Sequence, residues 1–384
     1  MAQFGDFTVD RNSTKYVLGS GGDIISYATD EPAFEFNADG SYKGLLVEPA
    51  ATNLCKQSED INTTWAPTNA TVTTNDTTAP DGTTTADKLE STATGSGTVV
   101  AQTLTTSAGT YTFSVWLKEG NTTTTNIRFT DAGTSDNTVT LTWATRTVSG
   151  TGGTTARVVT DLGSGDWIRI SLTYTLPAGG SDVVRIFAGA STGATAGEYV
   201  HVWGAQFEAS PIATSYIPTT TASVTRTKDD ITLGSASSLI GQTEGTLYVE
   251  VDWRGTGANQ LLLSANDGTS NNRIVIYNNV TPVELRMAAT ADGSLKTNQG
   301  VSSTGFSGIQ KIAFAYKTDD FELYRNGSSI SSDTTGSLAA LATLTDIDLG
   351  QQFDAGAQAN MWIRAVALFT RRLSDAECQA LTTL

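Results

Sequence analysis

Hydrophobic and polar residues alternate along most of this chain. The alternation is clearest at residues 110–118 (TYTFSVWLK), 166–174, 183–188 and 199–208. A period of two places successive side chains on opposite faces of a strand, so each stretch predicts a strand with one buried face. The strands are short and evenly spaced, and turns rich in Gly, Asp and Thr separate them. This pattern predicts a β-sandwich that begins with a strand at residues 44–47 and ends near residue 225.

A second group of strands follows a polar interruption at residues 218–238. Its strands are expected at residues 246–253, 260–264, 273–277, 311–316, 321–325 and 362–369. Asn326-Gly327 is a strong signal for a two-residue hairpin turn. We therefore expect an all-β protein in four parts: an N-terminal segment 1–43, a jelly-roll sandwich 44–225, a linker 226–239 and a second sandwich 240–384.

The last residues carry the only helical pattern. Ser374 and Glu377 have the spacing of a capping box, with Leu373 and Cys378 at the positions of a hydrophobic staple. Leu381 continues the apolar stripe, so we expect a short C-terminal helix docked on the last sheet. Cys378 and Cys55 are then interpreted as two small buried thiols, because nothing in their spacing indicates a disulfide.

The charge and composition of the chain argue against several classes of partner. The chain has 39 acidic and 23 basic residues, and its formal net charge of -16 does not suit a phosphate backbone. No stretch approaches the ~18 consecutive apolar residues of a membrane span. The N-terminus lacks the basic and apolar regions of a secretory signal. We expect neither a nucleic-acid partner nor membrane insertion, and no signal peptide.

Several longer stretches carry a family resemblance. The segments FTVDRNSTKYV, GLLVEPAATNL, TAPDGTTTADKL with Trp65 before it, and VWGAQFEASPIATSYIPTTTASVTR resemble a module of tailed-bacteriophage structural proteins of the head spike fibre or tail fibre type. The segments IGQTEGTLYVEVDW, FELYRNGSSI and FTRRLSDAECQAL resemble a concanavalin A-like (laminin G-like) domain. The resemblance implies a jelly roll akin to carbohydrate-binding modules, followed by a lectin-like sandwich.

The same resemblance implies a location and a task. We expect a non-enzymatic protein on the virion surface, assembled in the host cytoplasm, as a tail fibre or spike or as a head fibre or decoration. Its expected partners are other virion proteins, docked through residues 1–43, and host surface glycans. A homo-oligomer is expected, with a trimer favoured. The alternative is a phage depolymerase that hydrolyses host polysaccharide.

Two features bear on that alternative. Glu250, Asp252 and Arg254 alternate on one face of an expected strand, where related glucanases carry Glu-x-Asp-x-Glu. The arginine replaces the third carboxylate and would keep its neighbours ionised, whereas a glycosidase needs one protonated carboxyl group. His201 is the only histidine and lies among aromatic residues on a strand, where a packed, hydrogen-bonded side chain is the expected role. We therefore expect no catalytic residues.

The sequence offers some candidates for binding. Tyr277, Tyr324 and Arg325 are the glycan-binding candidates, because they are expected on a loop or an exposed sheet face; Trp116, Trp167 and Trp203 are expected in the core. No cofactor is expected, and calcium is the one metal for which turns supply ligands, at Asp81, Asp267 and Asp292. Each of these aspartates is also a common turn residue, and the turn interpretation is favoured.

Overall fold

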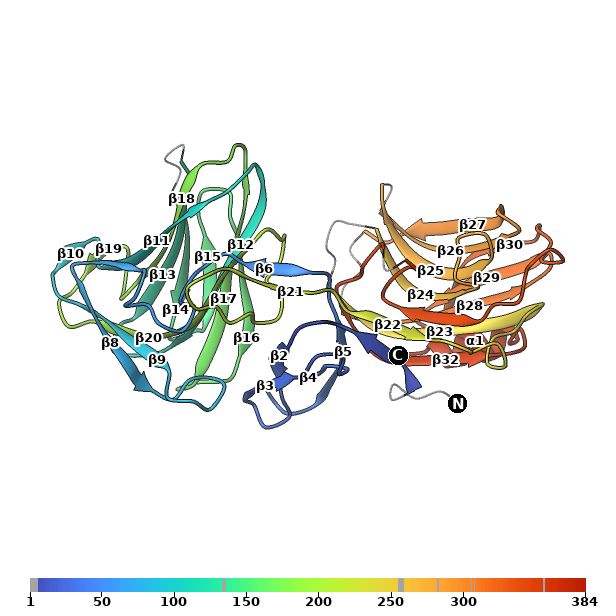
Figure 1. Ribbon diagram of the computed structural model, residues 1–384, viewed down its shortest axis with the longest axis horizontal. Coiled ribbons are helices and arrows are strands. Elements are labelled where there is room, and N and C mark those ends of the chain that lie inside the picture. The colour runs from blue at the N-terminus through green and yellow to red at the C-terminus, as the bar shows by residue number, and fades with distance from the viewer. Residues whose placement is uncertain are drawn as a thin grey trace.

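The computed structural model describes residues 6–132, 136–254, 259–281, 283–304, 306, 308–354 and 356–384. It contains two β-sandwiches side by side, and the C-terminus lies at the second one (Figure 1). Apart from one C-terminal helix, the described elements are strands, and their pairings are antiparallel. The predicted all-β class with two sandwiches is confirmed.

The first sandwich consists of two sheets of six described strands. One has the order β15 (Thr147–Gly150), β14 (Asp136–Thr142), β13 (Thr124–Thr130), β18 (Ser181–Phe187), β11 (Val99–Thr105) and β7 (Ala66–Thr68). The other has β16 (Thr155–Asp161), β17 (Trp167–Leu176), β12 (Gly109–Lys118), β20 (Tyr199–Glu208), β9 (Ala86–Ser91) and β8 (Ala70–Thr77). A short pair, β10 (Gly95–Ser96) and β19 (Thr192–Ala194), lies at one end. Inward-facing residues such as Phe113, Val115 and Ile170 form one core between the sheets.

The second sandwich consists of two sheets of seven described strands. One has the order β1 (Thr8–Asp10), β22 (Asp230–Leu233), β31 (Asp346–Leu349), β24 (Gln260–Asn266), β25 (Arg273–Val280), β26 (Val283–Ala291) and β27 (Ser294–Ser302). The other has β30 (Ser328–Asp333), β29 (Asp320–Arg325), β28 (Gly308–Lys317), β23 (Glu244–Trp253), β32 (Met361–Phe369), β5 (Tyr42–Val47) and β4 (Phe34–Phe36). As expected, Leu247, Val249 and Val251 of β23 point into its core, and Trp253 packs at the edge of that core.

The N-terminal residues correct the expected division of the chain. The strand expected to open the first sandwich, β5, pairs instead with β32 of the second sandwich, and β1 pairs with β22. Phe7, Val9 and Leu45 are buried in the core of the second sandwich. The expected boundary at residue 43 is therefore wrong, because β5 hydrogen-bonds to a strand from the far end of the chain and its apolar face is buried in the core of the second sandwich.

The hairpin of β2 (Lys15–Leu18) and β3 (Ile24–Tyr27) also belongs to the N-terminal segment, but it packs on the first sandwich. Leu18 and Ile24 cover Trp116, Trp167 and Trp203 on the outer face of the first sandwich. The three tryptophans are buried, as expected, but in this outer cluster and not between the two sheets. Residues 6–47 therefore contact both sandwiches, and the first sandwich is inserted between β5 and β22 of the second.

The helix α1 (Asp375–Thr382) has the expected capping box between Ser374 and Glu377. Leu373 and Cys378 pack with Tyr248 and Tyr324 on the outer face of a sheet, as predicted. Cys55 and Cys378 are both buried, free thiols. The hairpin turn between β29 and β30 is also confirmed, because Asn326 and Gly327 both have positive φ angles, 48° and 84°. In the described part of the chain, no helix is long and apolar enough to cross a bilayer.

Candidate functional site

The two sandwiches meet at a junction that the chain crosses twice. The outgoing and returning crossings pair as a short ribbon of β6 (Ala51–Asn53) and β21 (Val224–Arg226), visible between the sandwiches in Figure 1. Beside this ribbon, the backbone N–H of Glu48 donates to the Asp229 carboxylate at 2.8 Å. The backbone of the outgoing crossing thus binds a side chain of the returning crossing.

A buried ionic network surrounds the ribbon. Asp229 accepts hydrogen bonds from Arg11 Nη1 at 3.0 Å and from Lys15 Nζ at 2.6 Å. Glu48 lies 3.3 Å from Lys15 Nζ, 3.5 Å from Arg226 Nη2 and 3.4 Å from Arg254 Nη1. Complete burial of Glu48 opposes its ionisation, but these three cations outweigh burial and hold the pKa of Glu48 well below its usual value. The network ties the N-terminal segment, both crossings and the end of β23 together.

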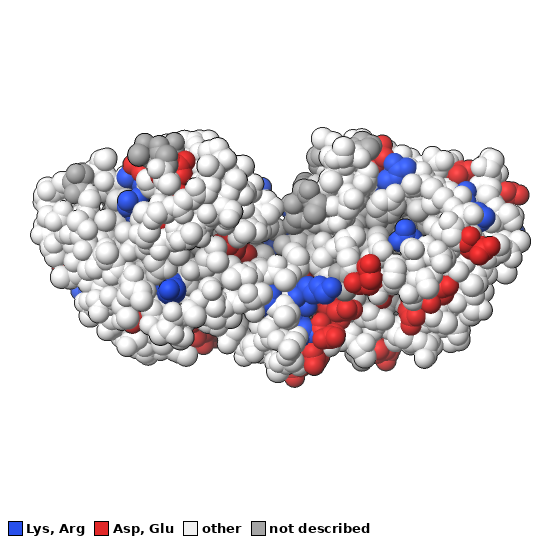
Figure 2. Space-filling model, turned by 45° about the horizontal axis from the view of Figure 1, so that its top comes forward, with Lys and Arg blue, Asp and Glu red and all other residues white. Residues whose placement is uncertain are grey.

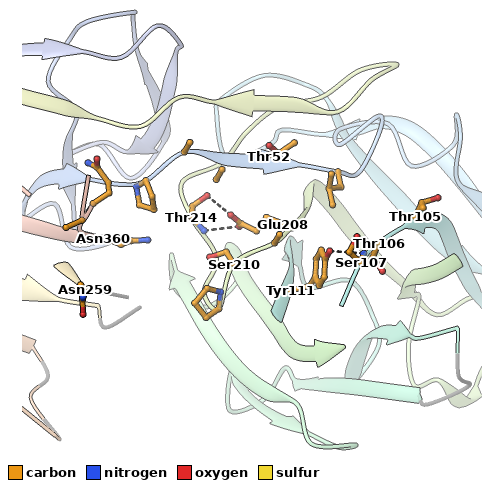
Figure 3. A pocket seen from close by; sticks show the side chains of 18 residues that line it. Thr52, Thr105, Thr106, Ser107, Tyr111, Glu208, Ser210, Thr214, Asn259 and Asn360 are labelled. Atoms are coloured by element: carbon orange, nitrogen blue, oxygen red, sulfur yellow. Dashed lines mark hydrogen bonds between the residues drawn. The ribbon is translucent and has the colours of Figure 1, made fainter. Parts of the chain in front are cut away.

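A cleft of about 850 Å³ opens beside the ribbon, between the two sandwiches. Residues at the ends of strands and in loops of both sandwiches line it (Figure 3): Pro49, Ala50, Ala51, Thr52, Leu54, Thr105, Thr106, Ser107, Tyr111, Glu208, Ala209, Ser210, Pro211, Thr214, Asn259, Ala357, Gln358 and Asn360. The space-filling view shows a notch between the sandwiches whose visible walls carry few charged side chains (Figure 2). The cleft is therefore a shared feature of the two sandwiches.

Glu208 and Tyr111 form the base of the cleft on the side of the first sandwich. Glu208, 1% exposed, accepts hydrogen bonds from the backbone N–H and the hydroxyl of Thr214 at 2.9 and 2.8 Å. Burial raises the pKa of Glu208, and its hydrogen bonds and the Arg169 charge oppose that rise. The Tyr111 ring stacks on Phe207 with centroids 5.1 Å apart, and its hydroxyl accepts from the Ser107 N–H. Both side chains are fixed by local contacts.

The chemistry of this lining is mostly neutral. Hydroxyl groups of Thr52, Thr105, Ser107 and Ser210, together with the amides of Asn259 and Gln358, provide donors and acceptors. Proline, alanine and leucine side chains provide apolar surface between them. Among the described residues that line the cleft, Glu208 is the one ionisable carboxylate, and lysine and arginine are absent. This mixture can hydrogen-bond and pack against an uncharged polar ligand.

The predicted glycan-binding residues do not come together. Tyr324 is 0% exposed and its hydroxyl donates to Asp375 under α1, so it cannot contact a ligand in this structure. The Arg325 guanidinium stacks on Phe306 with the Cζ atom 3.4 Å from the ring centroid. Tyr277 is half-buried on the outer face of β25, where its hydroxyl donates to Asn298 at 2.7 Å. The three lie outside the lining of the cleft.

The three aspartates considered as calcium ligands lie in tight turns of the backbone. Asp81 accepts from the backbone N–H and hydroxyl of Thr83, and Asp267 makes the same pair of contacts with Thr269. Asp292 has a positive φ of 50°, which suits a tight turn, and its N–H donates to Asn272. Across the described residues, no group of three or more His, Cys, Asp or Glu side chains is placed to hold a metal ion.

The residues weighed for the depolymerase alternative are engaged in structural contacts, in line with their expected non-catalytic roles. Glu250 accepts from Arg364 Nε at 2.9 Å. Arg254 leaves the expected ladder on β23 and instead contacts Glu48, with its guanidinium over the Trp362 ring at 4.5 Å. His201 Nε2 lies 3.0 Å from Asp76 Oδ2, and burial lowers the pKa of His201 against the pull of that carboxylate. His201 is hydrogen-bonded, as expected.

The residues of the cleft were not among the candidates from the sequence. Two of the segments that carry the phage resemblance, GLLVEPAATNL and the ASPIAT part of the longer stretch, supply much of its lining. The two stretches are about 160 residues apart and contact each other directly: the Ser215 N–H donates to Glu48 at 2.9 Å, and the Phe207 N–H donates to Asn53 at 3.0 Å. The sequence held one signal for this site, namely that both segments belong to the same module. The residue types themselves did not indicate a binding site, because alanine, proline, threonine and serine are common in turns.

Comparisons with known proteins give partial matches to solved structures. No family model and no curated protein matches the sequence. Among solved structures, the carbohydrate-binding module CBM40 of a Ruminococcus gnavus intramolecular trans-sialidase matches with 19% identity, over 38% of this chain and 86% of that chain, with a TM-score of 0.33. The binding domain of botulinum neurotoxin serotype D/C matches with 12% identity over 40% of each chain and a TM-score of 0.33. A leech intramolecular trans-sialidase matches with 15% identity over 38% of this chain and 24% of that chain, at a TM-score of 0.32. Each of these matches covers about two fifths of this chain.

Proposed function

We propose that this protein is a non-enzymatic glycan-binding protein and that the cleft between its sandwiches holds the glycan. The observation that carries the proposal is the lining of the cleft, in which neutral hydroxyl and amide groups alternate with apolar surface. Sugars present hydroxyl groups and apolar C–H faces together, and a site for them needs both kinds of partner. The size of the cleft, about 850 Å³, suits a short oligosaccharide.

The proposal extends to a location on the surface of a tailed-phage virion. The resemblance of GLLVEPAATNL and VWGAQFEASPIATSYIPTTTASVTR to phage fibre modules supports it, and these same segments build the cleft. In that setting the protein would be a fibre, spike or decoration that contacts a host glycan, as a homo-oligomer with a trimer favoured. Because Phe7, Val9 and Leu45 are packed within the chain, contact with other virion proteins would use exposed side chains of the N-terminal segment.

The alternative of a depolymerase finds less support in the cleft. Hydrolysis of a glycosidic bond by either common mechanism uses a pair of carboxyl groups, about 5–5.5 Å apart or about 6.5–9.5 Å apart. Glu208 has the raised pKa of a general acid, but it is the single carboxylate among the described lining residues. It is also fully engaged with Thr214 and Gln206. We therefore propose binding without hydrolysis.

A bulky side chain in the cleft tests the proposal. Ala209 is exposed and lines the cleft, so Ala209→Trp fills the space without disturbing the core. Ala339, exposed in the second sandwich and outside the cleft lining, provides the matched control Ala339→Trp. On an array of neutral oligosaccharides from bacterial surfaces, we expect the wild type and A339W to bind the same glycans and A209W to lose at least tenfold in affinity. Equal binding by A209W, or release of reducing ends by the wild type, would refute the proposal.

A further inference from the structure

The junction gathers several cationic side chains in a protein that is strongly acidic overall. Four cationic side chains there are almost completely buried, namely Arg11, Lys15, Arg169 and Arg226, and Arg254 joins them with 15% of its side chain exposed. The carboxylates near them are Glu48, Asp229 and Glu208, together with Glu35 beside Arg169 and Asp252 beside Arg254. These carboxylates largely balance the buried cations. A cation free to bind an anion must therefore be sought at the edge of the junction.

A second pocket opens at this junction, next to the end of β23. Its volume is about 190 Å³, and we call it the basic pocket; Arg157, Val158, Ser171, Ile212, Trp253 and Arg254 contribute to its lining. Two arginines line it, and aspartate and glutamate are absent from its described lining. Its volume suits one small ring, and not the longer chain that the cleft can hold.

Arg157 is the side chain that distinguishes this pocket. It is exposed on β16, opposite Ser171 of β17 in the register of the sheet. Among the described residues it has neither a hydrogen-bond partner nor an ion-pair partner, whereas Arg254 is held by Glu48, Asn360 and the Ala213 carbonyl. The donors of Arg157 are therefore free to form a bidentate contact with a carboxylate.

We propose that the basic pocket binds the carboxylate of an acidic monosaccharide unit, such as a hexuronate. The carboxylate pairs with Arg157, and the ring occupies the rest of the pocket, whose lining is mostly polar. The fixed guanidinium of Arg254 adds positive charge to the pocket without having to leave its present partners. This site is separate from the cleft, because the two linings share no residue.

Titration of the full chain with free glucuronate at low salt tests the proposal, with glucose as the neutral probe of the same ring size. Arg157→Gln removes the free cation from an exposed position, and Lys317→Gln removes one charge from an exposed position in the second sandwich as the control. We expect the wild type and K317Q to bind glucuronate at least tenfold more tightly than glucose. We expect R157Q to lose that preference, and 0.5 M NaCl to weaken glucuronate binding to the wild type.

The outcomes separate this site from the proposed glycan cleft. A209W is expected to retain glucuronate binding, because its substitution lies in the other lining. Failure of neutral oligosaccharides to bind would contradict the function of the cleft and leave the glucuronate result unaffected. Equal affinity of R157Q and the wild type for glucuronate, or no preference of the wild type over glucose, would overturn the basic pocket.

Discussion

The buried ionic network at the junction gives the most demanding prediction. Asp229→Asn keeps the size of the side chain and removes its charge. The carboxylate now accepts from Arg11 Nη1 at 3.0 Å, Lys15 Nζ at 2.6 Å and the Glu48 N–H at 2.8 Å. An asparagine has one acceptor oxygen for these three donors, and its amide N–H groups would face the remaining donors, to which they cannot hydrogen-bond. Arg11 and Lys15 would then be buried, at 1% and 0% exposure, without their main counter-charge.

Removing one partner from a buried, hydrogen-bonded charge pair costs about 3–5 kcal/mol. A loss of that size lowers the melting temperature of a domain as large as the second sandwich by about 6–20 °C. Calorimetry and urea unfolding would measure it, with Asp10→Asn as the control, because Asp10 is exposed on the neighbouring strand β1. We expect the control to stay within about 0.5 kcal/mol of the wild type. A destabilisation below 1 kcal/mol for D229N would refute the view that the network holds the sandwiches together.

Two further predictions concern the second sandwich. Burial raises the pKa of Asp348 from 3.8 to about 6, so the folded protein binds an extra proton in that interval and loses stability as the pH rises through it. Relative to the wild type, Asp348→Asn should therefore gain about 2 kcal/mol between pH 4.5 and pH 7 in urea unfolding; a constant difference would contradict this assignment. Tyr324→Phe should cost about 1 kcal/mol, because it loses the hydrogen bond to Asp375, and should leave binding on the glycan array unchanged. Loss of glycan binding in Y324F would restore Tyr324 as a ligand-contacting residue.

The local pattern of the chain was sufficient for some of its elements. Alternation predicted β12, β17 and β20, because successive side chains of a strand point to opposite faces. In the structure both faces of these strands are mostly buried, one of them in the core between the two sheets. The Asn326-Gly327 turn and the capping box of α1 depend on residues only a few positions apart, and both formed as predicted. Interactions between residues so close in the chain can be recognised from a single sequence.

The same pattern could not assign strands to sandwiches. The apolar residues of β5 require a buried face, but they do not specify which sheet covers it, and the partner β32 lies about 300 residues away. Likewise Arg254 was expected on an exposed charged face, whereas Glu48 draws it into the junction. Tyr324 looked suited to a ligand until α1 was placed over it.

The sequence by itself determined the all-β class, several of the long strands, the hairpin turn, the final helix and the acidic character of the chain. Tertiary structure alone decided that the N-terminal segment completes the second sandwich, and it alone created the cleft and the basic pocket. The physical reason is that strand alternation encodes which side chains are buried, whereas pairing partners and sites between sandwiches arise from contacts across long separations in the chain.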